Sequence, residues 1–163
     1  MKTTTPYPID EIRELLKNSV SEVFRTMFNI TARPAALRDI RESNEVLVAG
    51  IVGFVGDMNG VVYVYAKASF ARALAGRMLG LAEAELDGDE MVNDVMGELS
   101  NMIVGPVKSR LCDSGALCEL TIPSIVRGQN LSVEPDSSSE CRLLSMNCDT
   151  ELILIELLMK TSK

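Results

Sequence analysis

Residues 89–112 read DEMVNDVMGELSNMIVGPVKSRLC, and the rest of the predicted fold is built around this stretch. Its apolar residues recur every three or four positions, the spacing of one buried face of an α-helix. A second set falls on the opposite side as a single ridge, because its members are separated by four, three and four residues. The apolar face comprises Val92, Val95, Met96, Leu99, Met102, Ile103, Val107 and Leu111, and the ridge comprises Asp94, Glu98, Asn101 and Gly105.

The ridge and its surroundings contain residues that helix stability does not favour. Gly97 and Gly105 each cost about 1 kcal/mol relative to alanine in a helix interior, and Asn101 is a mediocre helix former. Beside a carboxylate and an amide, small residues make a flat polar surface that another backbone can approach closely. A solvated helix face of weak helix propensity explains the same spacing, so the pattern alone leaves both interpretations open.

Acidic residues mark the predicted start of this helix, and a proline lies near its end. Asp87 and Asp89 precede the first turn, and Glu90 follows Asp87 by three residues, which is the spacing of a capping box. Carboxylates at this end also interact favourably with the helix dipole. Pro106 has no backbone N–H, so we expect it to kink or end the helix.

The composition is that of one domain with an aliphatic core. The chain has 163 residues, of which 47% are hydrophobic and 4% aromatic, with no Trp. The net charge of −7 argues against nucleic acid or an anionic membrane as the main partner, because both bind basic surfaces. No apolar run approaches the roughly 20 residues of a membrane span. The N-terminal stretch MKTTTPYPIDEIRELL lacks the apolar core of a signal peptide, so we expect a cytoplasmic protein.

Cysteine and histidine content limits the chemistry that the chain can perform. Cys112, Cys118, Cys141 and Cys148 form no CxxC pair, and there is no histidine. A structural zinc site would need four scattered thiolates, so we expect reduced, buried cysteines, with a disulfide as the less favoured alternative. Without histidine, Ser-His-Asp and Cys-His catalysis and histidine-ligated metals are excluded. Any chemistry must use carboxylates, amides, hydroxyls or lysines.

Two further helices are predicted. Residues 8–28 have one broad apolar face, and Asn29 is a suitable stop. Residues 69–79 form the second, with Ser69 as its N-cap and Gly80 as its stop.

A β-hairpin is predicted between these helices. Residues 45–56 and 61–66 are rich in Val and aromatic residues, and Asp57-Met58-Asn59-Gly60 between them has the composition of a tight turn. Gly50, Gly53 and Gly56 in the first strand indicate that a helix packs closely over it. Residues 30–37 form a short extended segment, in which Pro34 favours a sheet edge.

The C-terminal third is predicted to be mostly strand. Residues 116–126 form one strand, and residues 128–140 form a polar surface loop. Residues 141–147 and 151–159 form an antiparallel pair, and the last of these is apolar on both sides except at Glu156, which predicts a mid-sheet strand covered on both faces. Strands on both sides of a helical block predict an α+β fold, with two long helices packed on an antiparallel sheet.

In this setting the ridge matches a known signature. The pattern Asp94-x-x-x-Glu98-x-x-Asn101-x-x-x-Gly105 resembles that of the CheC/CheX/FliY family of chemotaxis phosphatases. The hairpin VLVAGIVGFVGDMNGVVYVY and the segment FARALAGRMLG precede it, and LTIPSIVRG and a terminal strand pair follow. The likeness covers residues 8–160, which implies a single phosphatase domain of the family's α+β fold.

The number of sites makes the chain most similar to the CheX type. CheX-type members carry one such site, whereas CheC-type members carry two. The equivalent place in the first helix reads Ser21-Glu22-Val23-Phe24-Arg25, with arginine where the motif would have asparagine. The resemblance also implies a homodimer paired through its sheets.

The reaction implied by the resemblance is hydrolysis of the phospho-aspartate on a receiver domain such as CheY. The receiver supplies its own Mg²⁺ and lysine, so no cofactor is expected on this chain, and what must be added is a water in line with phosphorus. Asn101 suits this role, because an amide donates and accepts hydrogen bonds without carrying charge, and Glu98 would pair with the receiver lysine. Asp94, Gly97 and Gly105 would shape the contact surface.

Two other functions stay open. A catalytically inactive relative would bind a receiver, a flagellar-switch element or a deamidase-type partner without changing the dephosphorylation rate. A structural dimer protein would bury Glu98 and Asn101 between its protomers. For Asp94 and Lys108, the alternative of an ordinary exposed surface charge also stays open.

Overall fold

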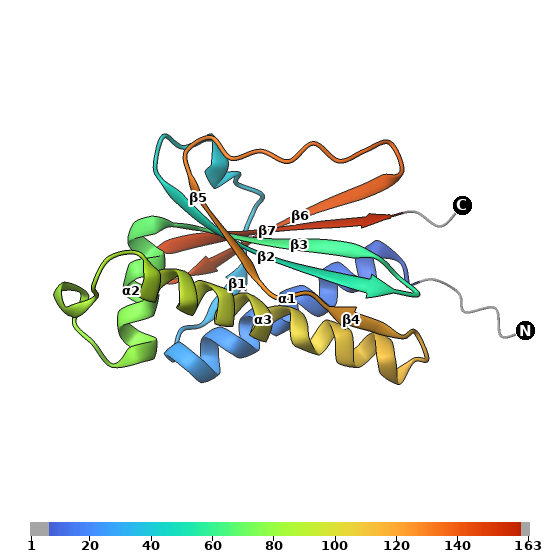
Figure 1. The fold of residues 1–163 in the computed structure, drawn as a ribbon, viewed down its shortest axis with the longest axis horizontal. Helices are drawn as coiled ribbons and strands as arrows, with labels where there is room; N and C mark the ends of the chain where they lie inside the picture. The colour runs from blue at the N-terminus through green and yellow to red at the C-terminus, as the bar shows by residue number, and fades with distance from the viewer. Residues whose placement is uncertain (1–6, 161–163) are drawn as a thin grey trace, which may run out of the picture.

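The computed structural model describes residues 7–160, which form one antiparallel sheet with helices packed on one face (Figure 1). The strand order is β1-β6-β7-β3-β2-β4, and β5 pairs with the same edge of β2 as β4 does. The helices are α1 (Ile9–Phe28), α2 (Ala68–Leu79) and α3 (Glu90–Asp113), with 3₁₀ turns η1 (Ile40–Glu42) and η2 (Glu83–Glu85). The strands are β1 (Ala32–Pro34), β2 (Leu47–Gly56), β3 (Gly60–Lys67), β4 (Cys118–Leu120), β5 (Ser124–Gly128), β6 (Ser139–Cys148) and β7 (Glu151–Lys160). The predicted α+β fold is confirmed, with the shorter α2 beside two long helices.

Several element boundaries follow from local backbone chemistry. Asn29 and Gly80 end α1 and α2 in the left-handed conformation, at φ 53° and 68°, so both predicted stops are confirmed. In the β2–β3 hairpin, the Asn59 side-chain oxygen accepts the backbone N–H of Gly56 at 3.1 Å. Pro34 lies in β1 at the edge of the sheet, where a missing N–H is tolerated.

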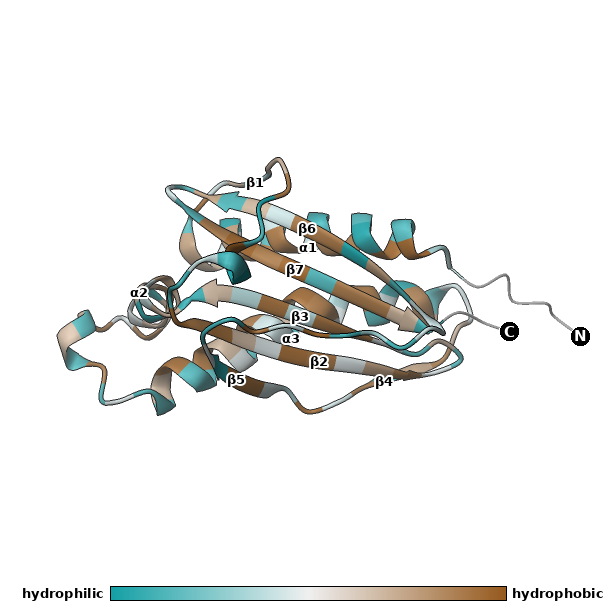
Figure 2. Ribbon diagram, turned by 90° about the horizontal axis from the view of Figure 1, so that it is seen from above, coloured by the Kyte–Doolittle hydropathy of each residue, from teal (hydrophilic) through white to brown (hydrophobic). Residues whose placement is uncertain are grey.

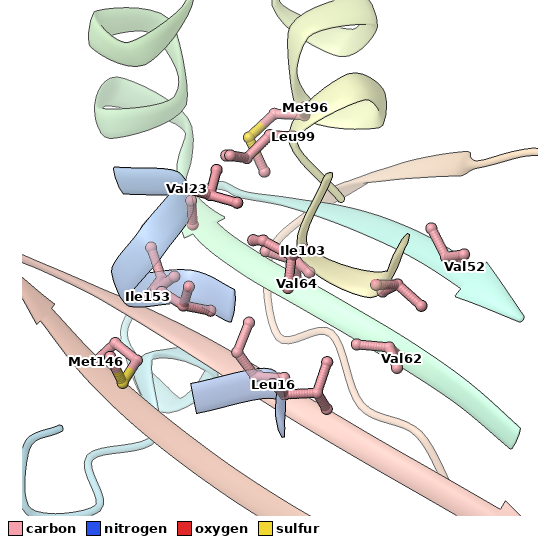
Figure 3. Packing of buried hydrophobic residues seen from close by; sticks show 14 of the residues in the cluster. Leu16, Val23, Val52, Val62, Val64, Met96, Leu99, Ile103, Met146 and Ile153 are labelled. Atoms are coloured by element: carbon pink, nitrogen blue, oxygen red, sulfur yellow. The ribbon is translucent and has the colours of Figure 1, made fainter. Parts of the chain in front are cut away.

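The core lies between the helices and the sheet (Figure 3). Met96, Leu99 and Ile103 of α3 point into it and belong to the same buried cluster as Val64 of β3 and Ile153 of β7. The predicted apolar face of α3 is buried at every position but one. The exception is Met102, which is half-buried.

Strand β7 lies in the middle of the sheet and is buried on both faces, as predicted (Figure 2). Ile155 faces the helices, whereas Leu154 packs on the other face in a smaller cluster with Ile40 of η1. Glu156 also points to that face, where its carboxylate accepts hydrogen bonds from the Tyr65 hydroxyl at 2.8 Å and from Arg41 Nη1 at 2.9 Å. The segment around η1 therefore covers the sheet opposite the helices.

Both predicted helix caps are wrong. Ser69 lies inside the first turn of α2, because the helix begins at Ala68, whose N–H donates to the Val46 carbonyl at 2.8 Å. At α3, Asp89 occupies the N-cap position but makes no side-chain cap. Its carboxylate instead lies 3.6 Å from the guanidinium of Arg127 on β5.

The single strand predicted for residues 116–126 is broken into β4 and β5. At the break, Thr121 donates its N–H to the Gly53 carbonyl at 2.9 Å and accepts the Gly53 N–H on its hydroxyl at 2.8 Å. Pro123 follows and has no N–H to pair with β2. Of the three glycines of β2, Gly50 faces a helix, whereas Gly53 faces Thr121 and Gly56 faces the backbone at Leu117.

All four cysteines are free, as predicted. Cys118 and Cys148 are buried, whereas Cys112 and Cys141 are only half-buried.

Within residues 7–160, no helix combines the length and the apolar character needed to cross a bilayer.

Candidate functional site

The four ridge residues lie together on the outward face of α3. Asp94 and Glu98 are exposed, and Asn101 and Gly105 are half-buried. In the described part of the chain, neither the Glu98 carboxylate nor the Asn101 carboxamide has a side-chain hydrogen bond or ion pair. Since the chain itself leaves these two groups unpaired, they are available to a visiting molecule.

Gly97 lies apart from this surface and does not have the exposure expected of a partner contact. It is buried, and a Cβ placed on it would lie 3.6 Å from Cβ of Pro123 and 4.0 Å from Cδ1 of Ile125. A side chain at position 97 would therefore be in ordinary van der Waals contact with Pro123 and Ile125 of the same chain.

A groove of about 750 Å³ opens between α1 and α3 beside the ridge. Asn101 and Gly105 line it on the α3 side. The remaining lining is mainly apolar and includes Leu15, Val23 and Met27 from α1 and Met102 and Pro106 from α3. The carboxamide thus borders an open apolar surface.

Sequence reasoning missed this groove, because its walls come from two helices, and the lining residues of α1 lie more than 70 positions before those of α3. One signal pointed to it: the apolar face of the first helix is too broad for a helix that buries a single stripe. Met27 at the edge of that face is 43% exposed.

Pro106 does not end α3, because the helix continues to Asp113. The proline has no N–H to donate to the Met102 carbonyl, one turn earlier. Since both residues line the groove, the interrupted backbone hydrogen bond lies at the candidate site and not in the core.

α1 does not carry a second Glu-x-x-Asn site. Arg25 donates to the Glu22 carboxylate at 2.7 Å, and both side chains are well exposed. An ion pair of this kind engages the carboxylate that a second Glu-x-x-Asn motif would keep free. On α3 the same spacing also occurs at Glu90 and Asn93, but the Asn93 side-chain oxygen accepts a hydrogen bond from Arg127 Nη2 at 2.8 Å.

Two basic residues of α3, Lys108 and Arg110, follow the ridge in the chain. Lys108 lies 3.9 Å from the Glu119 carboxylate, which is 89% exposed, so it is an ordinary surface charge, one of the alternatives expected from the sequence. Arg110 also lines the groove. Among residues 7–160, no three His, Cys, Asp or Glu side chains are grouped so that they could hold a metal ion.

A family comparison matches the centre of the chain. Residues 48–147 match the model of the family described as chemotaxis phosphatase CheX. The CheY-P phosphatase CheX of Thermotoga maritima is 25% identical over 123 residues, which cover 73% of this chain and 77% of that protein.

Solved structures of similar fold cover nearly the whole chain. Chemotaxis protein CheX from Vibrio vulnificus has a TM-score of 0.77 at 22% identity, over 95% of this chain and 100% of the other. The CheX-CheY-BeF3-Mg²⁺ complex from Borrelia burgdorferi gives a TM-score of 0.70 at 22% identity, over 92% of this chain and 98% of the matched one. At these identities the likeness establishes the fold.

Proposed function

The chain belongs to the family of the chemotaxis phosphatase CheX, and from this premise we propose that it accelerates hydrolysis of the phospho-aspartate on a CheY-like receiver domain. The observation that carries the proposal is the unpaired Asn101 carboxamide on the outward face of α3, one turn from the unpaired Glu98 carboxylate. The relative from Thermotoga maritima, a CheY-P phosphatase, and the complex of CheX with CheY from Borrelia burgdorferi support the same substrate.

In this proposal Asn101 orients the attacking water. The amide oxygen accepts a hydrogen bond from the water, and the amide NH₂ donates without adding charge beside the phosphoryl oxygens. The water oxygen forms the new bond to phosphorus while the bond to the aspartyl oxygen breaks, which releases the carboxylate and dihydrogen phosphate. Alignment of this kind contributes by positioning, because an acyl phosphate is already activated and we expect the receiver to carry the Mg²⁺.

Glu98 holds the receiver in register. Its exposed carboxylate forms an ion pair with the lysine beside the receiver's phosphorylation site, and charge-assisted hydrogen bonds are the stronger kind. Asp94 and Gly105 extend the contact surface on either side along α3. The apolar groove next to Asn101 offers the receiver surface that can be removed from water.

The test measures phosphate release from labelled receivers of the same organism, with and without this protein. Asn101→Ala is expected to lower kcat by about 100-fold while complex formation is kept. Glu98→Lys is expected to weaken binding about 10-fold or more, because it places like charges together. The matched controls, Asn147→Ala on β6 and Glu134→Lys in the β5–β6 connection, change exposed residues outside α3 and should have no effect.

The same assay separates the enzyme from a binding module. Stable association with every receiver, together with an unchanged dephosphorylation half-life, would make the chain an adaptor and refute the proposal. Equal loss of binding and of hydrolysis in Asn101→Ala would make Asn101 a docking residue only.

We also propose that residues 8–160 act as one domain and that the protein pairs with a second copy through its sheet. In the described residues β5 pairs only with β2, so its other edge has backbone groups free to pair, and Val126 on β5 is 42% exposed. Light scattering coupled to size exclusion reports the mass, and a monomer at micromolar concentration would rule the pairing out.

A further inference from the structure

Two buried serines lie at the turn of α3 that carries Asn101. Among the described residues four polar side chains are buried, namely Ser19, Ser100, Ser145 and Glu156. Ser100 directly precedes Asn101 and has no exposed surface, and Ser19 reaches the same turn from α1. Since buried hydroxyls cost free energy unless they are hydrogen-bonded, this concentration at one turn calls for a physical reason.

Ser100 is the residue through which α3 packs directly on strand β2. Its hydroxyl donates to the Met96 carbonyl at 2.7 Å, which turns it back along its own helix. Opposite it lies Gly50, where a Cβ would overlap the Ser100 hydroxyl and lie 3.0 Å from its Cβ and 3.2 Å from the Met96 carbonyl oxygen. The helix therefore lies close to the strand here, and a Cβ at position 50 would require the Ser100 hydroxyl to move and this turn to shift by a few tenths of an ångström.

Ser19 holds the same turn from a second direction. Its hydroxyl donates to the Ile103 carbonyl at 2.6 Å, and the bond is buried between α1 and α3. Ile103 lies two residues after Asn101, and its side chain is buried in the core. One contact therefore restrains the turn toward the sheet and the other toward α1, which opposes rotation of α3 about its axis.

We propose that three residues set the orientation of the Asn101 carboxamide. These positioning residues are Ser19, Ser100 and Gly50, on which Ser100 packs. The inference rests on the proposed function, in which that amide aligns a water. Misplacement of a catalytic group by about 1 Å costs about 100-fold in rate, so small changes beneath the helix are amplified at its surface. None of the three residues touches the receiver, and each acts through Asn101.

The test compares Ser19→Ala and Gly50→Ala with Ser145→Ala. Ser145 is as buried as Ser100, and its hydroxyl donates to the carbonyl and accepts the N–H of Arg38, each at 3.0 Å, on the face of the sheet away from the helices. For phosphate release, kcat is expected to fall about 10-fold in Ser19→Ala and about 100-fold in Gly50→Ala, with KM within about 3-fold of the parent value. The control should keep its kcat within about 2-fold while losing comparable thermal stability.

A second measurement keeps the inference separate from the proposed function. If the parent protein accelerates no receiver, the proposed function fails, and ¹⁵N relaxation then decides on positioning. The order parameter of the Asn101 side-chain carboxamide is expected to fall in Ser19→Ala and to stay unchanged in Ser145→Ala. Equal kcat losses in Ser19→Ala and the control, or an unchanged Asn101 order parameter in Ser19→Ala, would overturn the inference. Ser19→Ala keeps the test decisive where Gly50→Ala does not fold.

Discussion

Replacing Arg41 by methionine should destabilise the protein more than neutralising its partner Glu156. Arg41 lies on η1 and donates to Glu156 on β7 at 2.9 Å and to Asp39 at 2.8 Å. Its guanidinium also lies 5.3 Å from the centre of the Tyr65 ring. The Arg41 and Glu156 side chains are 13% and 4% exposed, so water screens this pair poorly.

The expected costs follow from which charge is left unpaired. Arg41→Met leaves the buried Glu156 carboxylate without a cation, and breaking a buried ion pair in this way costs about 3–5 kcal/mol. Glu156→Gln leaves the Arg41–Asp39 pair intact and loses one charge-assisted hydrogen bond, which costs about 2 kcal/mol. The double variant removes both charges and should be more stable than Arg41→Met alone.

Urea unfolding of the four proteins gives the free energies of unfolding and the coupling energy directly. Arg25→Met is the control, because Arg25 pairs with Glu22 on the exposed surface of α1 and should lose less than about 1 kcal/mol. A cost below 1 kcal/mol for Arg41→Met, or additive single and double variants, would refute the reasoning that η1 is held to the sheet by this ion pair.

Three further outcomes are expected. Gly105→Ala should raise the free energy of unfolding by about 1 kcal/mol, because nothing lies within 4 Å of the added Cβ and alanine favours the helix; a loss of stability in urea would contradict this. Burial raises the pKa of the Cys148 thiol from 9.0 to about 12, and burial together with the hydrogen bond to Glu156 raises the pKa of Tyr65. The folded chain keeps protons that the unfolded chain releases, so the contribution of these two groups to stability should be constant below about pH 9. Between pH 9 and 12 stability should fall by up to about 1.4 kcal/mol per pH unit and proton, with a shallower fall in Cys148→Ala; a flat urea midpoint between pH 9 and 12 would show otherwise. The half-buried Cys141 should react with Ellman's reagent faster than the buried Cys148, and equal rates would mean that the β6–β7 end opens freely.

The local elements were predictable, because their causes act within a few residues. The periodicity of residues 89–112 identified α3 and its apolar face, with Met102 as the one position less buried than expected. Turn chemistry located the β2–β3 hairpin, and Asn29 ended α1 where an αL residue is tolerated. The ridge itself was predicted from spacing, since residues three and four apart on a helix share a face whatever surrounds it.

Contacts between segments far apart in the chain could not be predicted from the spacing and turn chemistry of the sequence. Whether Gly97 is open or covered depends on Pro123, and whether a groove adjoins Asn101 depends on α1. The helix caps failed for the same reason, because Asp89 is engaged by Arg127 from a strand that follows 35 residues later. Local propensity has no information about such partners.

The amino-acid sequence by itself determined which side chains share the outward face of α3 and which classes of chemistry are excluded. Tertiary structure alone decided what supports that face: Gly50 of β2 beneath Ser100, and Ser19 of α1 beside it. The physical reason is that helical spacing depends on the bonds of one segment, whereas the height and rotation of a helix depend on the backbones against which it packs.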